Sequence, residues 1–192
     1  MNGVFLVLNF VMRLTVLSRA EVHITYKCDL QCLYCNRGCF SGIEFAPDMT
    51  IEQFKDFIEE VKKTNFGLKE IVIIGGEPTL HSDCIKFIEI ANEYTKSVEG
   101  ITMLYSNNYS PKAKDIISYV KDRNLCYVAD FSFKTHSENH AKNIDDFVVF
   151  ISPEDINKKR TEICGAYLYC GFSVDSLGYT LCSLGGMISS VL

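Results

Sequence analysis

The sequence has no apolar run long enough to cross a membrane. The apolar stretch at residues 4–12 contains Asn9 and is followed by Arg13, whereas a membrane-spanning helix needs about 20 apolar residues. A secretory signal peptide would start with positive charge, which this stretch lacks. We therefore expect no membrane partner, and we expect residues 1–19 to form an apolar segment that packs on the core.

An excess of positive charge is also missing. The 192 residues include 19 Lys and Arg against 24 Asp and Glu, which gives a net charge of −5. A protein that binds nucleic acid by neutralising phosphates needs the opposite balance, so we expect no nucleic-acid partner. There are no internal repeats and no low-complexity tract. Because 47% of the residues are apolar and 12% aromatic, the chain can build a folded core.

Cysteine is abundant, with nine residues in the chain. An odd number in a chain of this length does not suit a disulfide framework, which belongs mostly to secreted chains under about 100 residues. Most of the cysteines fall in two clusters, whereas Cys84 and Cys126 stand alone on apolar faces, where free cysteine is usually a core residue. Metal-bound thiolates in a reducing cytoplasm are the better interpretation.

The apolar pattern alternates between strand and helix periods. Thr50, with Gln53 three residues later, is typical of a capped helix start. The predicted strands are 20–26, 70–74, 101–105, 125–133 and 147–151, and the predicted helices are 51–64, 82–96 and 111–123, with a short helix after 152. Such alternation predicts βαβ units and a parallel sheet. The units are too few for an eight-stranded barrel, so we expect an open, partial (β/α) barrel of five to six strands.

Three cysteines follow the first predicted strand in the pattern Cys-x3-Cys-x2-Cys: Cys28, Cys32 and Cys35. Three thiolates so close together can bind three irons of a cubane cluster and leave the fourth iron open for chemistry. Their loop lies on the carboxyl side of a parallel sheet, where α/β proteins bind ligands. A zinc site with Cys39 as the fourth ligand is the alternative.

Two further motifs follow the next two predicted strands. Residues 75–78 read Gly75-Gly76-Glu77-Pro78, where the glycines let the backbone come close to a ligand and Glu77 supplies a carboxylate. Residues 106–108 read Ser-Asn-Asn, and Asn tolerates positive φ better than most residues. All three motifs are expected at the same edge of the sheet.

Together these motifs resemble those of the radical S-adenosylmethionine (SAM) enzymes, over residues 20–151. The resemblance implies a [4Fe-4S] cluster on the Cys28 triplet, and SAM held through Gly75, Gly76, Glu77 and Pro78, which face its methionine amino group. It also implies contacts of SAM with Asn107, Ser132 and, less specifically, Lys134. The cluster would reductively cleave SAM to a 5′-deoxyadenosyl radical that abstracts hydrogen from the substrate. An electron donor such as flavodoxin or ferredoxin is implied as a partner.

A second group of cysteines lies near the end of the chain: Cys164, Cys170 and Cys182. Residues 175–178 are typical of a hairpin turn between two short strands. The composition changes near residue 161, so we divide the chain into a barrel (20–160) and a small Cys-rich extension (161–192). The extension resembles a truncated SPASM or twitch domain, which implies an auxiliary iron–sulfur cluster. A zinc knuckle or unligated thiols are the alternatives.

The function expected from this resemblance is hydrogen abstraction from a peptide or carbohydrate-type substrate. No residue of the sequence is identified as a catalytic base or hydrogen donor. The alternative is a non-catalytic or fragmentary homologue that binds an iron–sulfur cluster or zinc without turnover.

Overall fold

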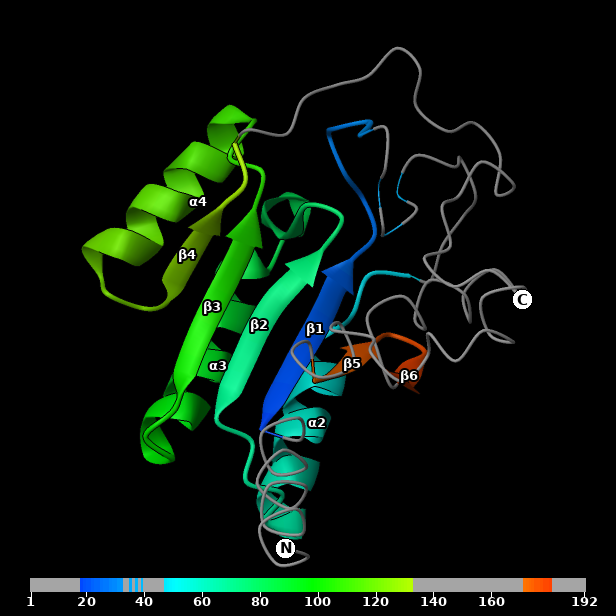
Figure 1. Cartoon of the computed structure of the whole chain (residues 1–192), viewed down its shortest axis with the longest axis vertical. Coiled ribbons are helices and arrows are strands. Elements are labelled where there is room, and N and C mark those ends of the chain that lie inside the picture. Colours follow the sequence, from blue (N-terminus) through cyan, green and yellow to red (C-terminus); the bar gives the residue numbers. More distant parts are fainter. Residues whose placement is uncertain are drawn as a thin grey trace, which may run out of the picture.

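A computed structural model of the chain describes residues 18–32, 35, 37, 39, 47–132 and 171–180, and the account below concerns these residues (Figure 1). The strands are β1 (Arg19–Thr25), β2 (Glu70–Gly75), β3 (Ile101–Ser106), β4 (Tyr127–Asp130), β5 (Phe172–Asp175) and β6 (Gly178–Thr180). The α-helices are α2 (Ile51–Thr64), α3 (Cys84–Ser97) and α4 (Pro111–Asp122), and η1 (Pro78–Leu80) is a short 3-10 helix.

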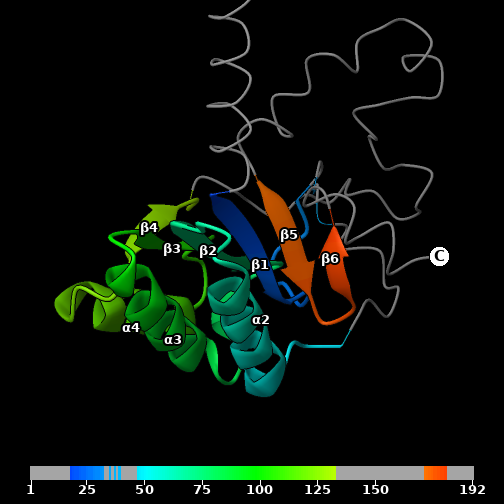
Figure 2. The same cartoon turned by 90° about the horizontal axis from the view of Figure 1, so that it is seen from below.

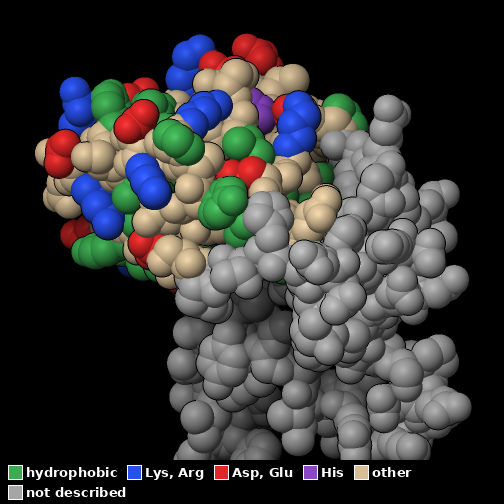
Figure 3. Space-filling view, turned by 90° about the horizontal axis from the view of Figure 1, so that it is seen from above, with side chains coloured by type: hydrophobic (Ala, Val, Ile, Leu, Met, Phe, Trp, Pro, Cys, Tyr) green, Lys and Arg blue, Asp and Glu red, His purple; other side chains and the backbone are tan. Residues whose placement is uncertain are grey.

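The six strands form one sheet in the order β4-β3-β2-β1-β5-β6. Every neighbouring pair is parallel except β5 and β6, which form an antiparallel hairpin. All three α-helices lie on one face of this sheet (Figure 2). The carboxyl ends of β1 to β4 point to the top of Figure 1, and Figure 3 views the molecule from that side, where basic and acidic side chains of the described residues are interspersed.

The start of α2 is fixed by a capping box, as predicted. The Thr50 hydroxyl accepts a hydrogen bond from the Gln53 backbone N–H at 3.1 Å, and the Gln53 side chain accepts one from the Thr50 backbone N–H at 2.9 Å. These two bonds satisfy donors that would otherwise be unpaired at a helix start. Among the described residues, no helix has the length and apolar character that a membrane span requires.

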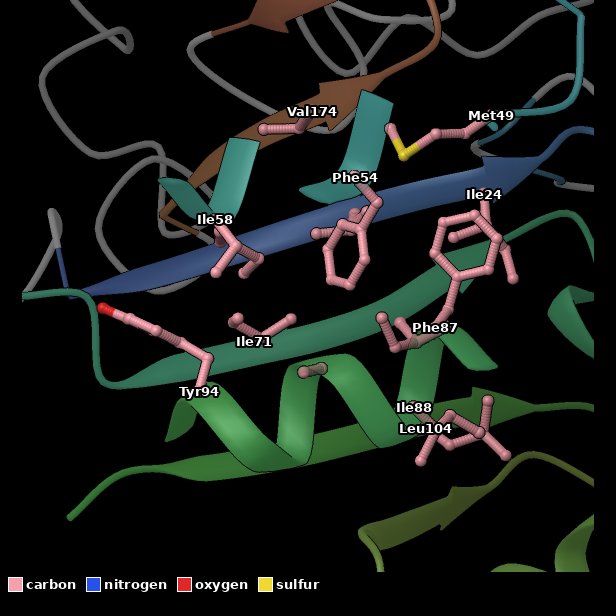
Figure 4. Packing of buried hydrophobic residues seen from close by; sticks show 14 of the residues in the cluster. Ile24, Met49, Phe54, Ile58, Ile71, Phe87, Ile88, Tyr94, Leu104 and Val174 are labelled. Carbon is pink, nitrogen blue, oxygen red and sulfur yellow. The ribbon is translucent and has the colours of Figure 1, made fainter. Parts of the chain in front are cut away.

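The hydrophobic core lies between the sheet and α2 and α3 (Figure 4). Ala20, Val22 and Ile24 point to the helices from β1, and each has no exposed surface. The Phe54 and Phe87 rings of α2 and α3 meet with centroids 5.2 Å apart. The core also contains Cys84, and Cys126 packs against it half-buried, so the prediction that these two cysteines are core residues is confirmed. Successive side chains of a strand point to opposite faces of the sheet, so Glu21, His23 and Thr25 lie on the face of β1 opposite the helices.

The predicted elements are confirmed within the described residues, with differences at their ends. The chain after β2 first makes η1, which is why α3 begins at Cys84 rather than at residue 82. β4 is shorter than the predicted strand 125–133; among the described strands it pairs with β3 alone, and Tyr127 is 66% exposed. The predicted apolar segment before residue 18, the strand 147–151 and the helix after 152 lie outside the described residues.

The predicted turn at residues 175–178 is confirmed as the turn of the β5–β6 hairpin. The Asp175 Oδ1 atom accepts hydrogen bonds from the backbone N–H groups of Leu177 (2.8 Å) and Gly178 (3.2 Å), which fixes the turn. The hairpin extends the main sheet, since β5 pairs with β1. The boundary at residue 161 lies outside the described residues and stays a prediction.

Candidate active site

The loop that carries Cys28, Cys32 and Cys35 leaves the carboxyl end of β1, and its two ends are tied together at its base. The Asp48 carboxylate accepts hydrogen bonds from the Thr25 hydroxyl and the Lys27 ammonium, each at 2.6 Å. Burial alone would raise the pKa of Asp48, but the bonds from Lys27 and Thr25 outweigh it and lower the pKa. Asp48 therefore stays charged near neutral pH and closes the loop.

None of the four cysteines of this region that the structure describes forms a disulfide. The Cys28 sulfur accepts a hydrogen bond from the Leu30 backbone N–H at 3.5 Å, and the Asn107 side-chain amide lies 3.9 Å from it. Burial raises the pKa of Cys28 to about 12. A hydrogen bond with Cys35, and then burial, raise the pKa of Cys39, which places Cys39 beside the triplet. Binding a metal here must therefore displace protons from the thiols.

Within the described part of the chain, no three His, Cys, Asp or Glu side chains converge on one point to bind a single metal ion. The thiolates of a cubane each bind a different iron, so they stand further apart than the ligands of one ion. The surroundings of Cys28 suit a ligand of such a cluster. Its sulfur ligands need hydrogen-bond donors around them, and Cys28 has a backbone N–H and an amide at hand.

The two glycines of the 75–78 motif allow the end of β2 to pack closely against the backbone at the end of β1. A Cβ atom on Gly75 would lie 2.0 Å from the Thr25 carbonyl oxygen, and one on Gly76 would lie 2.4 Å from the Lys27 carbonyl oxygen. The backbone N–H of Glu77 donates to that same Lys27 carbonyl at 2.8 Å. The close approach that the sequence suggests is therefore an approach to the chain itself, one residue before Cys28.

Glu77 is completely buried, and its carboxylate is hydrogen-bonded within the protein. Its Oε1 atom accepts from the Thr79 backbone N–H (3.1 Å), the Thr79 hydroxyl (2.6 Å) and the Ser106 hydroxyl (2.9 Å). Its Oε2 atom accepts from the Asn107 backbone N–H at 2.7 Å. Oε1 thus accepts three of the four hydrogen bonds and Oε2 accepts one. This side chain joins the end of β2 to the end of β3, and its resemblance-based contact with SAM stays a prediction.

Asn107 continues this link to the cysteine loop. Its side-chain amide donates to Asp29 Oδ1 at 2.8 Å as well as lying near Cys28, and its own side-chain oxygen accepts from the Tyr109 backbone N–H at 2.9 Å. Ser132 lies two residues after β4, where its backbone N–H donates to Asp130 at 2.8 Å. The contacts of Asn107 and Ser132 with SAM stay predictions.

Hydrogen bonds thus bring three of the predicted motifs to one edge of the sheet, at the carboxyl ends of β1, β2 and β3. The remaining predicted residues are not placed. Cys164, Cys170, Cys182 and Lys134 lie outside the described residues, so the auxiliary cluster stays a prediction.

Sequence analysis missed a set of polar residues on the face of the sheet opposite the helices. Glu21 is 2% exposed and pairs with Arg37 of the cysteine loop at 3.2 Å and with Arg19 at 3.4 Å. His23, also 2% exposed, stacks on Tyr26 with ring centroids 5.6 Å apart. The sequence contains a signal for this set, because Glu21 and His23 alternate with apolar residues in β1. A strand that is buried on both faces seldom carries a charged residue and a histidine.

Comparison with known proteins identifies the family to which this site belongs. Over residues 22–158 the sequence matches the Radical SAM superfamily. The chain belongs to this superfamily. Radical SAM proteins are enzymes that use SAM and a [4Fe-4S] cluster.

The alignments with individual relatives cover only part of this chain and part of each relative. A probable GTP 3′,8-cyclase of Methanocaldococcus jannaschii is 36% identical over 97 residues, which are 50% of this chain and 32% of the relative. The PqqA peptide cyclase of Bradyrhizobium diazoefficiens is 25% identical over 148 residues, 74% of this chain and 33% of the relative. The chain therefore spans about a third of the length of these curated relatives.

Among solved structures, BtrN in complex with AdoMet and 2-DOIA matches this radical SAM chain with a TM-score of 0.55 and 17% sequence identity. The match covers 88% of this chain and 74% of the BtrN chain. At this level of identity the likeness shows the fold.

Asn107 leads to a testable prediction about the radical SAM cluster. An N–H group near a ligand sulfur stabilises the more negative, reduced cluster, so removing it should lower the reduction potential. We expect Asn107→Leu to lower the potential by about 20–40 mV, as the loss of roughly 0.5–1 kcal/mol implies for one electron. Redox titration of the reconstituted protein, followed by electron paramagnetic resonance, measures this shift.

Asn108→Gly is the matched control for this measurement. Asn108 has a positive φ of 53°, which glycine adopts freely, and its amide donates to Asp130 rather than to a cysteine. The control should keep the wild-type potential. An unchanged potential in Asn107→Leu would show that the amide has no effect on the cluster.

Proposed function

We propose that this chain carries a working radical SAM site, with the cluster on Cys28, Cys32 and Cys35 and with SAM at the ends of β2 and β3. The observation that supports it best is the contact chain from Glu77 through Asn107 to Cys28 and Asp29. A cluster ligand and the two strand ends are thereby joined, so that SAM could meet the open iron in a fixed orientation.

Cys28, Cys32 and Cys35 would hold the cluster, which when bound would supply the electron for reductive cleavage of SAM and hydrogen abstraction from the substrate. The residues of this chain orient the reactants and exclude water. Glu77 holds the ends of β2 and β3 in place, and Gly75 and Gly76, which carry no side chain, let the end of β2 lie against Thr25 and Lys27 at the base of the cysteine loop. Asp48 keeps the cysteine loop closed at its base.

The substrate we propose is a peptide or a carbohydrate-type molecule. The names of the relatives include a peptide cyclase and a GTP cyclase, so both classes occur among similar proteins. Flavodoxin or ferredoxin is the proposed electron donor. Cys164, Cys170 and Cys182 are the proposed ligands of an auxiliary cluster.

Anaerobic reconstitution with iron and sulfide tests this function. We expect about four irons per chain at the first cluster, more if the auxiliary cluster forms. On reduction with dithionite in the presence of SAM, we expect 5′-deoxyadenosine, measured by liquid chromatography and mass spectrometry. No 5′-deoxyadenosine from the loaded protein, or zinc in place of iron, would support the non-catalytic homologue instead.

A further inference from the structure

The polar side chains on the face of β1 opposite the helices have hydrogen-bonding groups that the described protein does not satisfy. Both ring nitrogens of His23, Nη1 of Arg37 and Nε of Arg19 are buried without a hydrogen-bond partner. Burial lowers the pKa of His23 well below its usual value, and the nearby Arg37 guanidinium lowers it further. The imidazole is therefore neutral, with one donor and one acceptor to offer. Leaving several such groups unsatisfied is costly, so this cluster needs a polar ligand.

Charge indicates the character of that ligand. Arg19 pairs with Glu21 and Glu70, and Arg37 pairs with Glu21. Two positive and two negative groups leave the cluster neutral. A charged ligand buried here would find no uncompensated opposite charge, whereas a neutral ligand with hydroxyl groups would both donate and accept.

The position in the sheet indicates the shape of the ligand. β1 is hydrogen-bonded to β2 on one side and to β5 on the other, so a peptide cannot add to it as a further strand. The cluster instead presents side chains from a short stretch of β1 and from one loop residue. This arrangement fits a compact molecule.

We propose that His23 and Arg37 form a subsite for the hydroxyl groups of a compact, neutral, sugar-like substrate. The imidazole acceptor binds one hydroxyl hydrogen, and Arg37 Nη1 donates to an oxygen. Arg37 belongs to the cysteine loop, and the Tyr26 ring stacked on His23 lies two residues before Cys28. The ligand would therefore lie beside the cluster, where hydrogen abstraction takes place. This inference rests on the proposed function for the chemistry but not for the binding.

The test uses the reconstituted protein with SAM and four perdeuterated probes: D-glucose, N-acetyl-D-glucosamine, myo-inositol and guanosine. Isothermal titration calorimetry measures binding, and mass spectrometry detects deuterium transferred to 5′-deoxyadenosine. We expect at least one probe to bind and to transfer deuterium. His23→Leu should weaken its binding at least about tenfold, as the loss of one good hydrogen bond implies. His23→Gln, which keeps a donor and an acceptor, should recover part of the affinity.

Stability separates a binding role from a structural one. Because the His23 ring nitrogens have no hydrogen-bond partner within the described protein, His23→Leu should unfold at the same temperature as the wild type or higher. His81→Gln is the contrasting variant, since His81 is bonded to the Met49 carbonyl and the Asp83 backbone. It should lower the unfolding temperature and leave probe affinity unchanged.

Several outcomes would overturn the proposal. One is that none of the four probes binds while a Gly-Ser hexapeptide or glucose 6-phosphate does. Another is that His23→Leu binds the probes as tightly as the wild type, which would mean that ordered water satisfies the cluster. Failure of SAM cleavage in every sample, with probe binding intact, would count against the proposed function and not against the subsite.

Discussion

Replacing Cys32 by alanine should reduce the formation of 5′-deoxyadenosine to background and remove most of the iron at the first cluster. A cubane held by three thiolates loses a third of its protein ligands in this variant. Iron content, the visible absorption of the cluster and 5′-deoxyadenosine yield are the three measurements. We expect all of them to fall together.

The matched control is Cys126→Ala. Cys126 packs half-buried against the hydrophobic core, away from the cysteine loop, so its replacement removes a thiol without removing a ligand. The control should load iron and cleave SAM like the wild type. If Cys32→Ala keeps its iron and its activity, the cluster has other ligands. Loss of both properties in Cys39→Ala as well would place that residue among the ligands, as the zinc alternative requires.

The parts of this molecule that could be predicted from sequence depend on short-range information. The Cys28 triplet, the capping box at Thr50 and the turn at Asp175 each lie within a few residues, so their spacing is visible in the chain. The strand and helix periods are local in the same way. This is why the order of elements from β1 to β4 and the meeting of the motifs at one sheet edge were predicted.

The parts that could not be predicted depend on contacts between distant residues. That Glu77 binds Ser106 and Asn107 requires the register of β2 against β3, which no local pattern contains. The pairing of β5 with β1 joins residues about 150 positions apart. The sequence shows that His23 alternates with the core residues of β1. It does not show which face of β1 the helices cover, and the role of His23 depends on that face.

Glu77→Gln should destabilise the chain by about 2–4 kcal/mol, because it places an amide among four hydrogen-bond donors. Oε1 accepts three bonds and Oε2 one, so the amide –NH2 group must face at least one donor whichever way it turns. The least costly orientation sets it against the Asn107 backbone N–H. In that orientation the charged hydrogen bond from the Asn107 N–H is lost, and two N–H donors face each other. The Glu77 side chain has no exposure to water that could relieve this.

Chemical denaturation of the full chain measures this effect, with Glu89→Gln as the control. Glu89 is an exposed residue of α3, so the same change there should stay within about 0.5 kcal/mol of the wild type. Ser106→Ala should cost less than Glu77→Gln, since it removes one donor and leaves the carboxylate with three. Combining Ser106→Ala with Glu77→Gln should be less than additive, because both changes act on one network.

The same variant separates two roles for this carboxylate. If Glu77 positions the ends of β2 and β3, stability falls first, and the weaker hold on Asn107 also lowers iron retention through Cys28. If instead Glu77 reaches the methionine amino group of SAM directly, as the resemblance implies, Glu77→Gln should keep its stability and bind SAM more weakly. The carboxylate already accepts four internal hydrogen bonds, three at Oε1 and one at Oε2, and it is completely buried. We therefore expect the loss of stability, with SAM affinity reduced only to the extent that the strand ends move.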